Sequence, residues 1–206
     1  MEPDRASRQL AAIRELMERP VRYSTQSGLS GIIAGLAALA GCLADSTISR
    51  AYAQDEVTAT GINAIVWAGV FAAAFAGATI CTRLRERKQG MSFWSNVKKR
   101  ILRTILPPFL AGVGLTAAIV YRHFAYPEGP NLWGLIPAIW MLFYGVALWQ
   151  VGEFSVVEIR AMAVAFLLAG ILCAAELHTS PYLTLGVTFG GFHIVYGVVV
   201  WLRHGG

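Results

Sequence analysis

The residues best suited to chemistry are a histidine, two tyrosines and a glutamate in or beside long apolar stretches. His193 lies near the middle of the stretch 177–202, and Tyr196 follows it by three residues. Tyr144 lies midway along 129–152, and Glu158 precedes the next apolar stretch. An ionisable side chain at mid-membrane depth must face the bundle interior or a wet cavity. These four residues are therefore a candidate intramembrane polar site, in which Tyr144 is a hydrogen-bond partner for His193.

Three roles are open for His193. It is a neutral structural imidazole, a group that couples protons to transport near pH 6.5, or a ligand of haem or a metal. A bis-histidine haem needs a second histidine at the same depth, and His123, His178 and His204 all lie at span ends. We therefore predict no cofactor, with haem through His193 as a lesser option. His123, His178 and Glu176 on the outer side are better explained as solvated residues than as a metal site.

Two stripes of glycine indicate close helix packing. In the last apolar stretch the spacing is four, three and four, which places the residues within about 60° of one another on a regular helix. These residues are Gly186, Gly190, His193 and Gly197. The corresponding stripe of the first stretch contains Gly28, Gly31 and Gly35. Such a face either admits a neighbouring backbone or lines a cavity, and the sequence leaves both open.

No catalytic constellation is present in the sequence. There is no nucleophile–base pair, metal cluster or strand-then-helix context for a nucleotide-binding glycine loop. Cys42, Cys81 and Cys173 each lie in an apolar run and form no CxxC pair, which argues against a disulfide scaffold or zinc ribbon. We predict no catalytic residues, no metal site and no enzymatic activity.

Composition and length predict a polytopic membrane protein. The chain has 206 residues, of which 56% are hydrophobic and 14% charged, whereas about 25% of a soluble domain is charged. Stretches of roughly 20 apolar residues can each span a bilayer as a helix. We expect an all-α bundle, 24–206, with spans at about 24–45, 60–82, 104–121, 131–151, 159–177 and 181–202. Two inverted halves of three spans are an architectural option.

The basic residues predict the orientation. With six spans, 15 of the 17 Lys and Arg residues fall on one side, and only Arg50 and Arg122 fall on the other. The positive-inside rule then places both termini in the cytoplasm of a bacterial inner membrane. Anionic lipid headgroups, not nucleic acid, account for the net charge of +5. The alternative, a signal-peptidase site at 51–53, is disfavoured by the acidic residues of the N-terminal tail.

Two segments outside the spans have amphipathic patterns. In the cytoplasmic segment 1–23, Leu10, Ile13 and Met17 share one face of a helix over 6–19. The segment 93–106 carries a similar apolar face among basic residues, and Pro107-Pro108 should break or bend the path into the third span. Both segments suit a headgroup boundary or a docking partner.

Several motifs resemble an uncharacterised bacterial membrane-protein family. They are Ile13-Arg14-Glu15-Leu16-Met17-Glu18-Arg19, Ser27-Gly28-Leu29-Ser30-Gly31-Ile32-Ile33-Ala34-Gly35, Tyr144-Gly145-Val146-Ala147-Leu148, Glu158-Ile159-Arg160 and Gly191-Phe192-His193-Ile194-Val195-Tyr196-Gly197. The resemblance implies a six-span integral inner-membrane protein, sometimes encoded near a winged-helix regulator. It implies no established activity.

Two functional hypotheses follow from the sequence. The first is a non-enzymatic regulatory, sensory or accessory subunit, which acts by helix–helix association as a homo-oligomer or with a membrane-protein partner. The second is a small transporter or channel that uses the polar site around His193.

Overall fold

The computed structural model describes residues 27–88, 90, 96–176 and 180–204. This part of the chain is helical and contains no β-strand. The elements are α2 (Gly28–Ala51), α3 (Glu56–Lys88), α4 (Asn96–Ala125), α5 (Leu135–Val151), the 3₁₀ turn η1 (Gly152–Phe154), α6 (Val157–Ala175), α7 (Pro181–Leu185), the π-helix η2 (Gly186–Phe192) and α8 (His193–His204).

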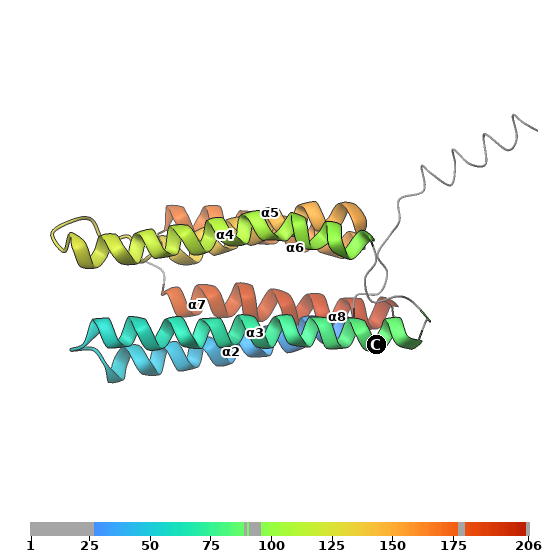
Figure 1. Ribbon diagram of the computed structural model, residues 1–206, viewed down its shortest axis with the longest axis horizontal. Helices are drawn as coiled ribbons and strands as arrows, with labels where there is room; N and C mark the ends of the chain where they lie inside the picture. The colour runs from blue at the N-terminus through green and yellow to red at the C-terminus, as the bar shows by residue number, and fades with distance from the viewer. Residues whose placement is uncertain (1–26, 89, 91–95, 177–179, 205–206) are drawn as a thin grey trace, which may run out of the picture.

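The long helices form two layers, as Figure 1 shows. One layer contains α4, α5 and α6, and the other contains α2, α3 and the continuous α7–η2–α8 segment. Within the layers α5 packs most extensively on α6, and α2 packs most extensively on α3 and α8. The layers therefore do not correspond to the first and second halves of the chain, because the last helix returns to the first two.

Five described segments are long and apolar enough to cross a membrane: Gly28–Ala51, Glu56–Lys88, Lys98–Ala125, Val157–Ala175 and Pro181–Arg203. The expectation of an all-helical membrane protein is confirmed at this level. The helix α5 is also apolar but has 17 residues, which corresponds to roughly 26 Å at 1.5 Å per residue. The amphipathic helix predicted over 6–19 lies outside the described residues.

Helix α4 continues through Pro107 and Pro108, so the break that the sequence suggested at this pair is absent. Each proline removes one backbone donor from the helix. Contacts just beyond the prolines fasten α4 to α5: Trp140 Nε1 donates a hydrogen bond to Thr116 Oγ1 at 3.0 Å, and the Phe109 ring packs edge-on against Trp140. Packing against α5 thus supports α4 where its backbone hydrogen bonds are interrupted.

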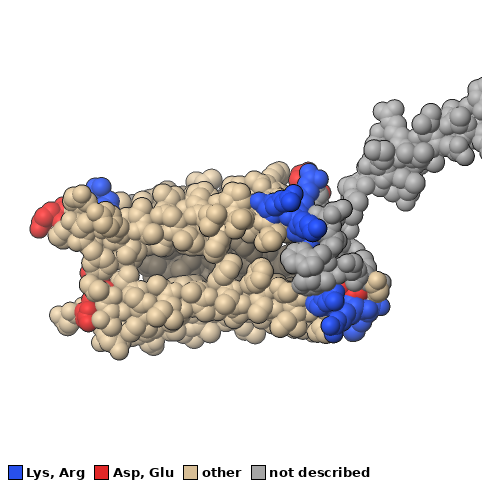
Figure 2. Space-filling view, in the orientation of Figure 1, with Lys and Arg blue, Asp and Glu red and all other residues tan. Residues whose placement is uncertain are grey.

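Basic residues gather at one end of the bundle, as Figure 2 shows. Of the 12 Lys and Arg residues in the described part, only Arg50 and Arg122 lie at the other end. The helices alternate in direction, so the end of α3, the start of α4, the start of α6 and the end of α8 all reach the basic end. The alternation that the sequence predicted from charge is therefore present in the arrangement of the described helices.

Candidate intramembrane polar site

His193 and Tyr144 form a hydrogen bond between the two layers. The Tyr144 hydroxyl lies 2.7 Å from His193 Nε2, and His193 is 8% exposed. The hydroxyl donates to Nε2 when the ring proton is on Nδ1, and accepts from Nε2 in the other tautomer. This contact joins α5 in one layer to the start of α8 in the other.

Aromatic rings enclose this pair. The imidazole packs edge-on against Phe166 of α6, with centroids 5.6 Å apart, and lies nearly parallel to Phe189 at 6.0 Å. Tyr144 also contacts both phenylalanines. His193 Nδ1 is buried without a hydrogen-bond partner among the described residues, although the Phe189 carbonyl on the preceding turn lies close to the ring. The site is a buried polar pair enclosed by aromatic rings.

The His193 side chain and the neighbouring glycines contact different layers, and the π-helix η2 ends directly before His193. On a regular helix the glycines and His193 would share one face, as the sequence suggested. In the structure Gly190 and Gly197 face α2, whereas the His193 ring contacts α5 and α6. His193 and Gly197 lie four residues apart on the regular helix α8, which separates them by about 40°, so the imidazole reaches the other layer from beside the glycine face. The backbone of this segment therefore packs within one layer while the side chain of His193 reaches the other.

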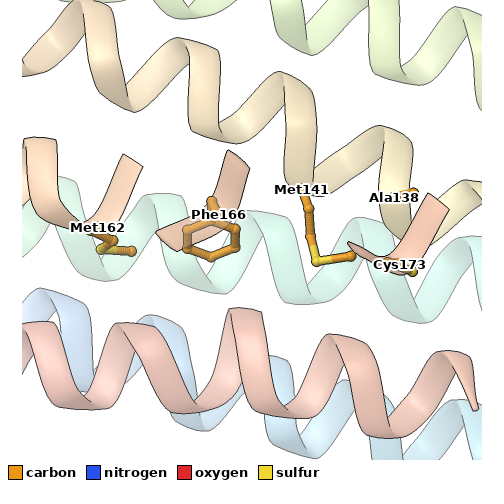
Figure 3. Packing of buried hydrophobic residues seen from close by; sticks show 5 residues of the cluster. All are labelled: Ala138, Met141, Met162, Phe166 and Cys173. Carbon is orange, nitrogen blue, oxygen red and sulfur yellow. The ribbon is translucent and has the colours of Figure 1, made fainter. Parts of the chain in front are cut away.

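The remaining two residues of the predicted site lie at different distances from the pair. Tyr196 packs against the apolar core that contains Ala138, Met141, Met162, Phe166 and Cys173 (Figure 3), as Tyr144 also does. Glu158 lies at the basic end, where Arg203 Nη1 approaches its Oε1 to 3.1 Å. Arg203 is ten residues from His193, or roughly 15 Å along a helix. Tyr144 and His193 are thus in contact, whereas Glu158 lies at the basic end of the bundle, where α6 of one layer meets α8 of the other.

The two glycine stripes pack against each other within the chain. A Cβ built on Gly35 would lie 2.6 Å from the Gly190 carbonyl oxygen, and one on Gly197 would lie 2.7 Å from the Ile32 backbone nitrogen. A Cβ built on Gly31 would lie 3.0 Å from the Gly197 Cα. Gly28 meets the backbone of the end of α8 as well. These glycines admit a neighbouring helix, α2 against η2–α8, and do not line a cavity.

Gly186 is the looser member of this set. A Cβ added to it would meet Leu39 Cδ2 at 3.7 Å, which is an ordinary contact. The close approach therefore starts at Gly190, inside the π-helix.

A second polar cluster, which sequence reasoning missed, joins α2 to α3. Trp67 Nε1 donates to Asp45 Oδ2 at 2.8 Å, Ser49 Oγ donates to Asp45 Oδ1 at 3.3 Å, and Asn63 Nδ2 donates to Ser49 Oγ at 3.1 Å. The predicted first span stops at about Asp45, but α2 continues to Ala51. The signal in the sequence is the four-residue spacing of Asp45 with Ser49 and of Asn63 with Trp67, which places each pair on one helix face.

Contacts between acidic and basic side chains lie at both ends of the bundle. At the basic end Lys98 Nζ contacts the buried Glu86 Oε2 at 2.6 Å, and Arg160 Nη2 contacts Glu153 Oε1 at 2.9 Å. At the opposite end His123 Nε2 lies 3.0 Å from Glu56 Oε1. Two of these pairs, Glu86 with Lys98 and Glu56 with His123, join α3 to α4 across the layers.

The described residues contain no group of three His, Cys, Asp or Glu side chains close enough to hold a metal ion. The weak outer site considered from the sequence included His178, which lies outside the described residues. Comparison of the chain with protein-family models, with curated proteins and with solved structures finds no match. The resemblance to a bacterial membrane-protein family stays a prediction.

Proposed function

We propose that the chain is a six-span protein of the bacterial inner membrane, with both termini in the cytoplasm. Two features support this topology. The shortest of the long helices, α5, is apolar along its length, and η1 and the turn before Leu135 extend its path at both ends. The concentration of Lys and Arg at one end fits the positive-inside rule and contact with anionic headgroups.

Within that topology we propose that the protein acts by association with a membrane-embedded partner, as a regulatory, sensory or accessory subunit. The observation that supports this most directly is the outer face of α3. Only 6% of the 18-residue apolar stretch of α3 is buried, against 28% for that of α2 and 33% for that of α6. The exposed small residues on this helix are Gly61, Ala64, Ala68, Gly69, Ala72, Ala73, Ala76 and Ala78.

The glycine stripes of α2 and α8 cannot serve the same purpose, because they are already in contact with each other. By contrast, a Cβ on Gly61 or Gly69 would meet nothing within 4 Å. Small residues let a second helix approach closely, and the van der Waals packing that results contributes to helix association in lipid. The face of α3 is therefore the surface on which we expect a partner helix.

The test is association measured in lipid nanodiscs or native membranes after leucine substitution. Ala68→Leu with Ala72→Leu adds bulk to the face of α3, and Ala117→Leu with Ala118→Leu makes the same change on exposed positions of α4. We expect the α3 pair to weaken association by tenfold or more, since overpacking costs roughly 1–3 kcal/mol, and the α4 pair to leave it unchanged. A native protein recovered alone at monomer mass refutes the proposal.

A second candidate function is transport, favoured by the hydrogen bond between Tyr144 and His193. This bond is a polar contact buried between the two layers. The helices of different layers contact one another much less than helices within a layer, so movement of one layer against the other would expose the bond. Solute or proton flux in proteoliposomes tests the idea, with His193→Ala as the variant and the exposed Tyr121→Phe as the control. Equal flux in all three proteins removes His193 from any such mechanism.

A further inference from the structure

A groove of about 450 Å³ lies at the basic end of α3. Its lining residues all belong to the C-terminal part of this helix: Thr79, Ile80, Arg83, Leu84 and Arg87. They form two adjacent rows with a spacing of four residues, one of Thr79, Arg83 and Arg87 and the other of Ile80 and Leu84. Rows with this spacing are ridges on a helix surface, and the space between two ridges can receive atoms of a neighbouring molecule.

The two rows differ in chemistry. Ile80 and Leu84 are 57% and 55% exposed, and they continue the apolar surface of α3 toward the basic end. Arg83 is the first charged residue after Glu56, so the long apolar stretch of α3 ends within the groove. Arginine at such a position keeps its carbon stem along apolar surface and its guanidinium group among the lipid headgroups. The groove therefore lies where hydrocarbon gives way to headgroups.

The lining of the groove carries two cations and no acidic residue. The one carboxylate at this end of α3 belongs to Glu86, which is 2% exposed and contacts Lys98 of α4 at 2.6 Å. Arg87 is exposed and forms no ion pair with another described residue. A negatively charged group from outside the chain is therefore the electrostatic complement of this groove.

The side chains of the lining suit a phosphate group that carries acyl chains. A guanidinium group binds phosphate oxygens through two parallel N–H donors, and the Thr79 hydroxyl is a further donor. Ile80 and Leu84 offer apolar contacts that an acyl chain uses and a free phosphate ion does not. The volume of the groove lies within the range of roughly 300–1,000 Å³ that is usual for small-molecule sites.

We propose that this groove binds one glycerophospholipid whose headgroup has a net negative charge. Arg83 and Arg87 contact the phosphate group, and Ile80 and Leu84 contact the first methylene groups of an acyl chain. The inference rests on the proposed topology, which places the basic end in the cytoplasmic leaflet, where anionic lipids attract basic residues. It does not depend on the proposed partner helix.

The experiment is native mass spectrometry of the full chain in an uncharged detergent, with dioleoyl phosphatidylglycerol or dioleoyl phosphatidylcholine as the added probe. The native chain should bind one phosphatidylglycerol about tenfold more tightly than phosphatidylcholine, since each basic residue near an anionic surface contributes a factor of about five. Arg83→Gln with Arg87→Gln should abolish this preference. The affinity for phosphatidylcholine should stay the same, because Ile80 and Leu84 are unchanged.

The matched control is Lys99→Gln with Arg103→Gln. These two cations are also exposed, four residues apart and at the basic end, but they lie on α4 and do not line the groove. The control should keep the preference for phosphatidylglycerol. Arg87→Gln alone should weaken phosphatidylglycerol binding about fivefold, and it provides the test if circular dichroism shows that the double variant of the groove is unfolded.

Three outcomes overturn the proposal. Equal losses in the groove variant and in the control would show that lipids respond only to the net charge of the basic end. Equal affinity of the native chain for the two lipids would exclude recognition of the headgroup charge. Displacement of bound phosphatidylglycerol by millimolar inorganic phosphate would identify a site for soluble anions. The measured mass gives the number of chains and of lipids separately, so a monomer with one bound phosphatidylglycerol would refute the proposed partner and support this site.

Discussion

The contact between α2 and η2–α8 gives the sharpest prediction, through Gly35→Ala. The added methyl group would lie 2.6 Å from the Gly190 carbonyl oxygen, 2.6 Å from Ile194 Cγ1 and 3.1 Å from the Ile194 backbone nitrogen. Two of these three neighbours are backbone atoms, which cannot move without moving the helix. The methyl group therefore forces α2 and η2–α8 apart.

The expected magnitude follows from the size of that displacement. The approach to the carbonyl oxygen is about 0.8 Å shorter than the 3.4 Å at which ordinary contacts begin. A gap of 0.5–1 Å forfeits roughly a quarter to a half of the dispersion energy of each contact across the interface. Overpacking costs about 1–3 kcal/mol, and alanine returns up to about 1 kcal/mol through its helix propensity. We expect the free energy of unfolding to fall by about 2 kcal/mol.

The assay is reversible unfolding of the detergent-solubilised protein by titration with a denaturing detergent, followed by circular dichroism. The matched control is Gly114→Ala on α4, where the added Cβ meets nothing within 4 Å. The control should be neutral or more stable by up to about 1 kcal/mol, because it gains helix propensity without a contact. The two glycine-to-alanine changes should therefore have opposite effects or differ by about 2 kcal/mol or more.

Equal stability of Gly35→Ala and Gly114→Ala would refute the reasoning. It would mean that α2 and α8 do not approach at backbone distance, and the whole account of the two glycine stripes would fail with it. Gly190→Ala provides an independent check from the opposite helix, where the three atoms nearest to the added methyl group belong to the Leu39 side chain, at 2.6–3.6 Å. A smaller loss is expected there, since a side chain can rotate away.

Three further predictions concern polar contacts. Tyr144→Phe leaves His193 Nε2 without its partner, which should cost about 1–3 kcal/mol of unfolding free energy for a buried group, measured by the same titration. Lys98→Ala removes a cation from the carboxylate of Glu86, which is 2% exposed, and should cost about 3 kcal/mol. The Thr58 side chain and backbone N–H hold the pKa of Asp55 below its usual 3.8. The stability that the ionised carboxylate contributes is therefore present above pH 3.8 and is lost as the pH falls through the pKa of the folded protein. The thermal midpoints of the native protein and of Asp55→Asn should converge over that fall in pH.

The first two of these have a matched control on an exposed residue. Tyr121→Phe removes a hydroxyl from a tyrosine that is 69% exposed, and should leave stability within about 0.5 kcal/mol. Lys99→Ala removes an exposed cation next to Lys98 in sequence, and should be similarly mild. A loss for either control that equals its buried counterpart would show that burial is not the cause. Midpoints that stay apart at acidic pH would contradict the interpretation of Asp55.

Much of the architecture is predictable from the sequence because membrane insertion depends on local properties. Long apolar stretches must satisfy their backbone groups internally, so α2, α3, α4, α6 and α7–α8 lie close to their expected places. The boundaries are less accurate: α3 extends from Glu56 to Lys88 and α4 from Asn96 to Ala125, because helices continue past the apolar core wherever the flanking residues permit. The prolines in α4 do not break it, since neighbouring contacts support the helix through them.

The pairing of Tyr144 with His193 is predictable as a contact, because a mid-span imidazole needs a partner. Its geometry is not, because it depends on how α8 is placed against α5 and α6 in the bundle. The glycine spacing likewise predicts close packing without naming the partner. Whether those glycines meet another helix of the same chain, a second protein or an empty space depends on how α8 is placed in the bundle.

The helical membrane class, the charge asymmetry between the two ends and the set of faces that must be close or polar are all predictable from the sequence. These follow from hydropathy, periodicity and the cost of unpaired groups, which act within about one helix. Three features depend instead on how the helices are placed in the bundle. The first, second and last described helices form one layer, the α2 and α8 glycines pack on each other, and Asp45 contacts Trp67 across α2 and α3. The physical reason is that in lipid many helix pairs have similar hydrophobic energy, so the choice among them depends on side-chain and backbone fit between segments far apart in the chain.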